Sequence, residues 1–221
     1  PTLTISTDDE EENGNYHFED GISQVPEYQL SNGEKKQLEG WCHEFGHELG
    51  LPDYYDTDGS SEGVGNWAVM AAGSWGNNGE TPVYFSAYSR YWLGWDEPIL
   101  VQGDIPNLVI EPVSEGGKIY KLPIPGNWTD SEQYFLLENR QQTKYDTYLP
   151  GEGLLIWHID EEVMFSKWSS NTVNNDEEHK GMDLEEADGD DDLDSGANRG
   201  DSGDPYRSGS FTKDTYPNSL A

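Results

Sequence analysis

The segment HEFGH at residues 43–47 contains two histidines and a glutamate with the types and spacing of a hydrolytic metal site. On a helix, His43 and His47 lie one turn apart on the same face, so both imidazoles can bind one metal ion. Glu44 lies about 100° round the helix, where it can reach a water on that metal without being a ligand. The spacing therefore predicts a zinc site in which Glu44 acts as the general base.

The residues that follow His47 indicate a third ligand. Gly50 permits the left-handed turn that ends a helix, and Pro52 prevents the helix from resuming. The chain then folds back, so Asp53 can supply the third ligand of a zinc site with one open position. The alternative is an amphipathic helix with two surface histidines, which leaves the glycine, the proline and the aspartate unexplained.

The helix that must carry these residues is marked at its start and along one side. Ser31 or Asn32 can cap it. Apolar side chains recur at helical spacing and are expected to form its buried stripe: Leu38, Trp41 or Cys42, Phe45 and Leu49. The two histidines fall to one side of this stripe, where a cleft could lie.

The segments HEFGHELGLPDYYD (residues 43–56) and VGNWAVMAAGSW (residues 64–75) resemble the catalytic core of the immune inhibitor A family of secreted bacterial metallopeptidases. The similarity continues in YFSAYSRYWLGW (84–95), YFLLENRQ (134–141) and YDTYLPGEGLLIWHID (145–160), and in two segments within residues 184–206. These enzymes are zincins of the metzincin type. The resemblance thus implies a secreted, extracellular zinc endopeptidase that acts on proteins or peptides.

The resemblance also implies roles for single residues. It implies that His43, His47 and Asp53 are the zinc ligands, that Glu44 is the catalytic base, and that Met70 forms a methionine turn beneath the metal. Without the resemblance, a methionine among apolar neighbours is most often a core gap-filler.

The group that would stabilise the oxyanion of the reaction stays open. Ala72 stands where some metzincins have a tyrosine. Five other side chains are conceivable, although each is more often a wall or core residue than a catalytic one: Tyr54, Tyr55, Tyr84, Tyr88 and His158.

We expect an α+β protein with two parts. Residues 1–97 are predicted to form the zinc-binding catalytic core, and residues 98–221 a β-rich part with an acidic segment. Residues 81–93 predict a helix, and short runs predict strands in an antiparallel sheet or small sandwich at residues 99–101, 108–110, 118–122, 133–139 and 153–159. The resemblance implies a zincin-like core whose upper subdomain precedes the zinc helix. Only 42 residues precede His43, so this upper subdomain is expected to be short or missing.

Charge and composition exclude some partners. Forty-four acidic and twelve basic residues give a formal net charge of -32. Such a chain lacks the basic footprint that binds nucleic acid, and it is repelled by anionic membranes. The single cysteine, Cys42, excludes an internal disulfide framework. Because the sequence begins at Pro1 and shows no signal peptide, we expect it to be a processed or excised piece. Separately, we expect the protein to be a monomer.

Residues 176–204 are strongly acidic and contain glycine. Alternating carboxylates in a flexible loop suit calcium, which takes six to eight oxygen ligands. The candidate calcium ligands are Asp188, Asp190, Asp192, Asp194, Asp201 and Asp204. A solvated acidic loop is the alternative. Two other functions also stay open: a zinc hydrolase of a non-peptide bond, and a calcium-dependent binding or structural module with a vestigial zinc site.

Overall fold

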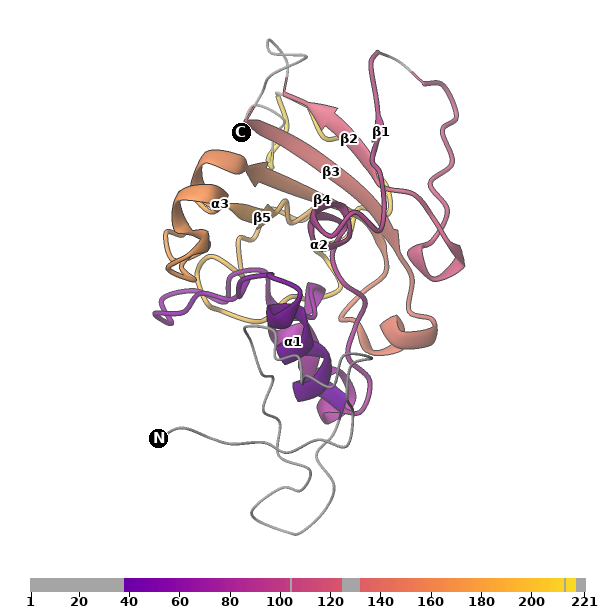
Figure 1. Ribbon diagram of the computed structural model, residues 1–221. Coiled ribbons are helices and arrows are strands. Elements are labelled where there is room, and N and C mark those ends of the chain that lie inside the picture. The colour runs from indigo at the N-terminus through magenta and orange to yellow at the C-terminus, as the bar shows by residue number, and fades with distance from the viewer. Residues whose placement is uncertain (1–37, 104, 125–131, 213, 218–221) are drawn as a thin grey trace, which may run out of the picture.

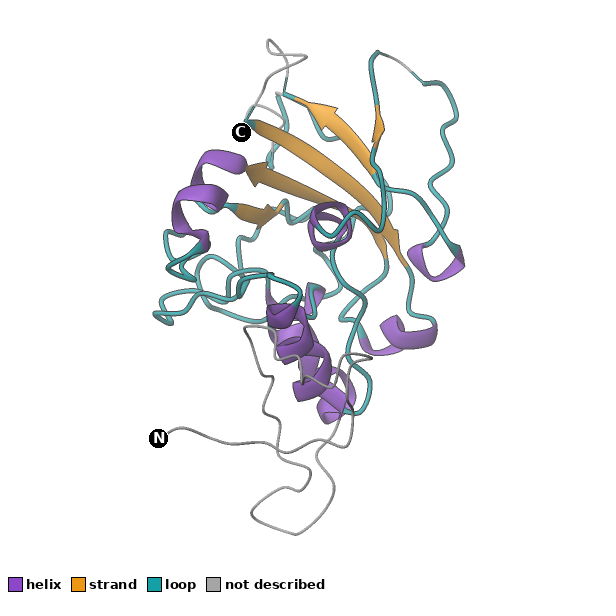
Figure 2. Ribbon diagram, viewed as in Figure 1, coloured by secondary structure: helices purple, strands orange, loops and turns teal. Residues whose placement is uncertain are grey.

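The computed structural model describes residues 38–103, 105–124, 132–212 and 214–217 (Figure 1). The helix α1 (Leu38–Glu48) lies at one end of this part of the chain, and a five-stranded sheet lies at the other, with α2 (Ala87–Trp92) in front of it and α3 (Glu161–Trp168) at its side. Figure 2 shows that long loops connect these elements. The expected α+β class is confirmed. The capping residues expected near Ser31 lie outside the described residues.

The sheet follows the chain order from β1 to β5. Its strands are β1 (Ile99–Leu100), β2 (Tyr120–Pro123), β3 (Gln133–Arg140), β4 (Gly153–Asp160) and β5 (Met182–Leu184). The first two strands pair in parallel, and all other pairs are antiparallel. The two eight-residue strands β3 and β4 pair along their whole length and form the centre of the sheet.

Four of the five expected strands are present, but residues 108–110 do not form one. Leu108 follows Asn107, whose positive φ of 57° belongs to a turn, and the Leu108 amide donates to the carbonyl of Ile105. Val109 is 69% exposed. An apolar run without a neighbouring strand to complete its hydrogen bonds does not become a strand.

Two elements were not expected from the sequence, and one is shorter than expected. α3 starts where Asp160 caps it by accepting from the amide of Val163 (3.1 Å), and β5 is a three-residue edge strand. α2 begins only after Ser86, whose hydroxyl accepts from the amide of Ser89. The five residues before Ser86 are not helical, and the amides of Val83 and Tyr84 donate to Gly73 and Asp146, so tertiary contacts override the helical pattern there.

The inner face of the sheet packs on the loop that follows α1. Leu136 of β3 lies opposite Trp157 of β4, and both side chains are fully buried in one core. Trp67 and Met70 join this core from the segment after α1. Strand alternation places the side chains of every second residue on this face, which explains the burial pattern of both central strands.

In the expected buried stripe of α1, Cys42 packs against the core, whereas its alternative Trp41 is exposed and the prediction for Phe45 is wrong. Trp41 is 46% exposed and Phe45 is 56% exposed. Gly46 is buried instead, because the sulfur of Met70 lies where its side chain would be. The helix therefore packs through a glycine against a methionine, which lets it approach the core closely. No helix among the described residues is long and apolar enough to cross a membrane.

A buried network of ion pairs connects the inner face of the sheet to the loops below it. The Arg140 guanidinium donates to both carboxylate oxygens of Asp146 (2.6 and 2.7 Å) and to the carbonyl of Trp67 (3.1 Å). Glu138 accepts from Arg90 of α2 (2.9 Å) and from the Trp157 indole (2.9 Å). These contacts cross the expected boundary between residues 97 and 98, and that division stays a prediction.

Candidate metal centre

The structure brings His43, His47 and Asp53 together. Nε2 of His43 lies 3.0 Å from Oδ1 of Asp53, and Nε2 of His47 lies 3.2 Å from the same oxygen. The two imidazole rings are 4.8 Å apart and perpendicular. These three side chains offer one ligand atom each within 4.8 Å of one another, a spacing that could hold a metal ion.

The turn after α1 forms where the sequence indicates. Gly50 has a φ of 95°, its amide donates to the carbonyl of His47, and the amide of Leu51 donates to the carbonyl of Gly46. This pattern of paired bonds around a left-handed glycine ends the helix and reverses the chain. Asp53 is thereby returned to the face that carries the two histidines.

Backbone carbonyls orient both imidazoles. Nδ1 of His43 lies 2.9 Å from the carbonyl oxygen of Val69, and Nδ1 of His47 lies 2.8 Å from that of Leu51. In each neutral ring the Nδ1 hydrogen is donated to a carbonyl, so Nε2 carries the lone pair. This is the arrangement in which histidines bind metals, with the second nitrogen fixing the ring and the tautomer.

The Asp53 carboxylate is held asymmetrically. It is buried, and its Oδ1, which faces the histidines, has no hydrogen-bond partner. Burial opposes its charge, but the contacts with His43, His47 and Asn171 outweigh that effect and hold the pKa of Asp53 well below its usual range. The close contact with Asp53 also raises the pKa of His47. An anionic oxygen between two imidazole lone pairs is a donor set that fits a divalent cation such as zinc.

Glu44 and Tyr55 lie beside this group. The Asp53 carboxylate, and to a smaller extent the charge of Glu44, contribute to the raised pKa of both His47 and Tyr55. The Tyr55 ring stacks on that of His43 at 6.2 Å. Burial and the Asp53 carboxylate raise the pKa of Tyr55 to about 12, so its hydroxyl stays protonated at neutral pH and can donate a hydrogen bond.

The other four candidates for oxyanion stabilisation have different partners. Tyr54 is buried in the core with its hydroxyl beside that of Ser89, Tyr88 donates to Glu161, and Tyr84 packs edge-on against Tyr145. His158 lies against Phe135 on the outer face of the sheet. Of the five tyrosine and histidine candidates, the structure therefore leaves Tyr55 at the metal-binding group.

Met70 lies beneath the helix between the two histidines. Its sulfur fills the space at Gly46, and its carbonyl accepts from the amide of Tyr54 (2.8 Å). The preceding residue, Val69, supplies the carbonyl that orients His43. Met70 is completely buried in a turn, and its role as the methionine turn of a metal site stays a prediction.

One residue that contacts this group gave no signal in the sequence. Asn171, in the loop after α3, donates from Nδ2 to Oδ2 of Asp53 (2.6 Å), and its Oδ1 accepts from the Asp53 amide (2.7 Å). The two residues are 118 positions apart. No local pattern connects such distant positions, so only the tertiary structure reveals this contact.

A second group of metal-ligand type lies in the acidic segment. Glu186, Asp188 and Asp204 offer carboxylate oxygens within 4.8 Å of one another. Burial, followed for Asp204 by the charges of Asp201 and Asp188, raises the pKa of Glu186 to about 8 and that of Asp204 to about 6. Glu186 was not among the residues expected from the sequence, because it precedes the alternating aspartates.

The four other expected aspartates have different surroundings. Asp192 accepts from the side-chain amide of Asn198, Asp194 pairs with the buried ammonium of Lys180, and Asp201 accepts from the amide of Gly203. Asp190 is exposed. The structure thus groups Asp188 and Asp204 with Glu186 and leaves the other four outside that group.

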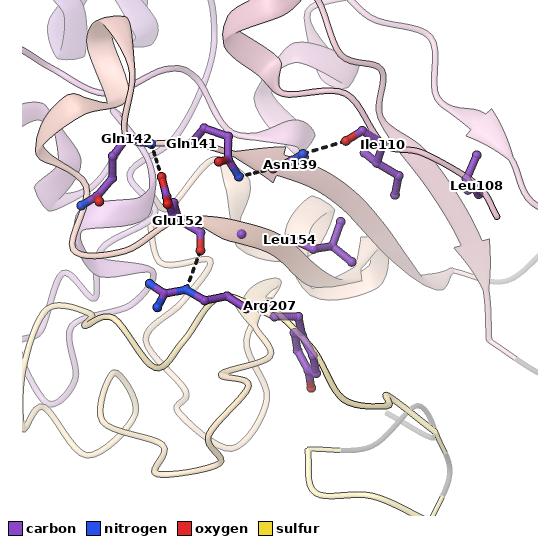
Figure 3. Close-up of a pocket in the computed structure, with 10 residues that line it drawn as sticks. Leu108, Ile110, Asn139, Gln141, Gln142, Glu152, Leu154 and Arg207 are labelled. Carbon is purple, nitrogen blue, oxygen red and sulfur yellow. Dashed lines mark hydrogen bonds between the residues drawn. The ribbon is translucent and has the colours of Figure 1, made fainter.

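A groove of about 760 Å³ lies at another place, over the ends of the central strands (Figure 3). Its polar side chains bond to backbone carbonyls or to one another: Asn139 donates to the Ile110 carbonyl, Gln141 to the Asn139 side chain, and Arg207 to the Glu152 carbonyl. None of the residues of the metal-binding group lines it. The groove therefore has no evident part in the chemistry of that group.

Comparison with known proteins agrees with this geometry. A sequence model described as the immune inhibitor A peptidase M6 catalytic domain matches residues 5–96, which include the three predicted zinc ligands and Glu44. Over these residues the chain is similar to the immune inhibitor A family of metallopeptidases. This similarity supports a metallopeptidase, which implies a metal ion.

Two curated relatives match shorter segments. The pre-pro-metalloprotease PrtV of Vibrio cholerae is 46% identical over 59 residues, which are 24% of this chain and 6% of PrtV. Immune inhibitor A of Bacillus thuringiensis subsp. alesti is 48% identical over 53 residues, which are 22% of this chain and 8% of that protein. The matches thus span less than a tenth of either relative. No solved structure matches this chain.

Proposed function

We propose that this chain forms the centre of a secreted zinc endopeptidase that hydrolyses peptide bonds in extracellular proteins. The observation that carries the proposal is the convergence of Nε2 of His43, Nε2 of His47 and Oδ1 of Asp53, with both Nδ1 atoms held by backbone carbonyls. Two imidazoles and one carboxylate are a ligand set of catalytic zinc sites. The names of the relatives, a metalloprotease and an immune inhibitor, support the same reaction class.

The roles of the side chains follow from their chemistry. His43, His47 and Asp53 would hold the zinc, which would supply Lewis acidity toward a peptide carbonyl and ease the ionisation of a water. Glu44 would take the proton from the attacking water and deliver it to the leaving amine. Tyr55, whose ring stacks on that of His43, would donate a hydrogen bond to the developing oxyanion.

Removal and return of the metal test this function. The purified 221-residue chain should bind about one zinc per molecule and cleave fluorescently labelled casein, because its donor set matches three-ligand zinc sites. Dipicolinic acid, a zinc chelator, should abolish cleavage, and added zinc should restore it whereas magnesium should not. Cleavage that persists after the zinc has been removed would contradict the proposal. Zinc-loaded protein that never cleaves casein would instead favour a binding module with a vestigial site.

The proposed enzyme also binds calcium through Glu186, Asp188 and Asp204. Three carboxylates in one small space repel each other, and a divalent cation offsets that repulsion with the oxygen ligands it prefers. Asp204 also accepts from the indole of Trp67 (2.9 Å), so the group is connected to the core beneath the metal centre. Extracellular modules bind calcium with dissociation constants of roughly 0.1–1 mM. A calcium site in this segment therefore agrees with a secreted protein.

Calcium should raise the melting temperature of the chain, and one aspartate should decide the effect. At about 100 times its dissociation constant, calcium should stabilise the folded state by about 2.7 kcal/mol, or roughly 5–10 °C for a chain of this size. The variant Asp188→Asn should lose most of this shift. The matched variant Asp190→Asn, which changes an exposed carboxylate outside the group, should keep it. Thermal unfolding with and without calcium measures the shift of the melting temperature in each variant. An equal loss of this shift in the two variants would contradict the proposed calcium site.

A further inference from the structure

The metal-binding group is enclosed by a loop that is distant in the sequence. The loop after α3, residues 169–176, runs beside the segment that follows α1. The Trp168 indole donates to the carbonyl of Gly50 (3.0 Å), and Asn174 donates from its side chain to the carbonyl of Tyr54 (2.9 Å). Asn175 accepts from the amide of Thr57 (3.2 Å). Asn171 lies in the same loop, and its contacts reach a predicted zinc ligand, Asp53.

Asn171 holds Asp53 at two points. Its side-chain amide donates to Oδ2 of the carboxylate at 2.6 Å and accepts from the Asp53 backbone amide at 2.7 Å. The carboxylate cannot rotate without breaking the first of these bonds. Its other oxygen, Oδ1, is therefore left facing Nε2 of both histidines.

Asn171 is itself fixed by the end of α3. Its amide donates to the carbonyl of Trp168 (3.0 Å), and its backbone adopts a left-handed conformation with a φ of 57°. Asparagine tolerates this conformation better than most residues, and it alone combines that tolerance with an amide that both donates and accepts. A residue held in this way can position another without motion of its own.

We propose that Asn171 is a positioning residue of the metal centre, which fixes the Asp53 carboxylate in the orientation that binds the metal. Ligating carboxylates are commonly held by a hydrogen bond to the oxygen that does not bind the metal, and losing such a partner typically costs about 10- to 100-fold in metal affinity. The inference rests on the proposed zinc site. It adds a determinant at a position outside residues 5–96, which are the ones matched by the catalytic-domain model.

The test compares zinc affinity in two asparagine variants. Asn171→Gly keeps the left-handed backbone and removes the amide. Asn175→Ala removes the side-chain contacts with Thr57 and Asp58 that join the same two segments, but none with Asp53. Competition with a chromophoric zinc chelator should give an affinity about 10- to 100-fold weaker for Asn171→Gly. The zinc affinity of Asn175→Ala should stay within about threefold of that of the unmodified chain. A change of that size corresponds to only a small difference in binding free energy.

Two further readouts separate positioning from simple stabilisation of the loop. The visible spectrum of the cobalt-substituted chain should change in Asn171→Gly, because the orientation of one ligand changes, and should be unchanged in Asn175→Ala. Asn171→Ala should repeat the loss of affinity, because it also lacks the amide. Equal zinc affinity of Asn171→Gly and the unmodified chain would overturn the inference. An equal loss of zinc affinity in Asn175→Ala would overturn it too, because any contact that holds the loop against the segment after α1 would then explain the effect. If the unmodified chain binds no zinc, the proposed function itself fails.

Discussion

Replacing Glu44 by glutamine should lower the kcat/KM for casein by about 100- to 10,000-fold, the contribution typical of a positioned general base. Glutamine has almost the same shape but cannot accept the proton of the attacking water. Zinc content should stay the same, because Glu44 is not among the three side chains whose ligand atoms converge. Peptide hydrolysis and atomic absorption on the same preparation measure both quantities.

Glu48→Gln is the matched control for this variant. Glu48 lies one turn further along α1 and is exposed. Its replacement by glutamine removes one negative charge from the helix, as Glu44→Gln does. It should retain nearly full activity. If Glu44→Gln keeps the activity of the unmodified chain, the assignment of Glu44 as the base is wrong. If Glu48→Gln loses as much activity, the loss reflects the charge of the helix and not a proton transfer.

Replacing Arg140 by methionine should be the most destabilising single change in the sheet. Asp146 is completely buried and loses both bonds from the Arg140 guanidinium in this variant, and the buried Glu138 loses one of its two arginine partners. Removing one member of a buried ion pair typically costs about 3–5 kcal/mol. For a chain of this size, that corresponds to a fall of the melting temperature of roughly 6–20 °C. Thermal unfolding followed by circular dichroism measures it.

A second variant and a control make the result specific to the buried pair. Arg140→Met combined with Asp146→Asn should be more stable than Arg140→Met alone, because no unpaired charge remains on that side. Arg199→Met breaks the pair with Glu62 in which the arginine is 59% exposed, and it should cost less than about 1 kcal/mol. A similar loss in Arg140→Met and Arg199→Met would contradict a special role for the buried network.

This network also contributes to the shape of the metal centre. Arg140 donates to the carbonyl of Trp67, and three residues later Met70 fills the space beneath the metal helix. Val69, between them, orients His43 through its carbonyl. The sheet thus supports the loop that holds one histidine and the underside of α1. Stability of the sheet and geometry of the metal centre are therefore connected through a short piece of backbone.

The fold was predictable where local patterns decide it. Alternating apolar residues indicated both central strands to within a residue at their ends, because neighbouring strands of a half-buried sheet impose that alternation. The pattern misled at residues 108–110, where no strand pairs with the apolar run. It also misled at Phe45, which lies at helical spacing but is exposed, because the glycine beside it gives closer packing on Met70.

By itself, the sequence determined the chemistry of the candidate site. The one-turn spacing of His43 and His47 follows from the period of the helix, and Gly50 and Pro52 enforce the reversal that returns Asp53. These are effects of neighbours along the chain, so they can be read locally.

Only the tertiary structure decided what surrounds that site. It brought Asn171 to Asp53 across 118 positions, grouped Glu186 with Asp188 and Asp204, and left Tyr55 as the tyrosine beside the histidines. Each of these depends on how distant segments pack together, and packing is specified by the whole core and by no single local pattern. The sequence therefore predicted which atoms could bind a metal, and the folded chain showed what orients them.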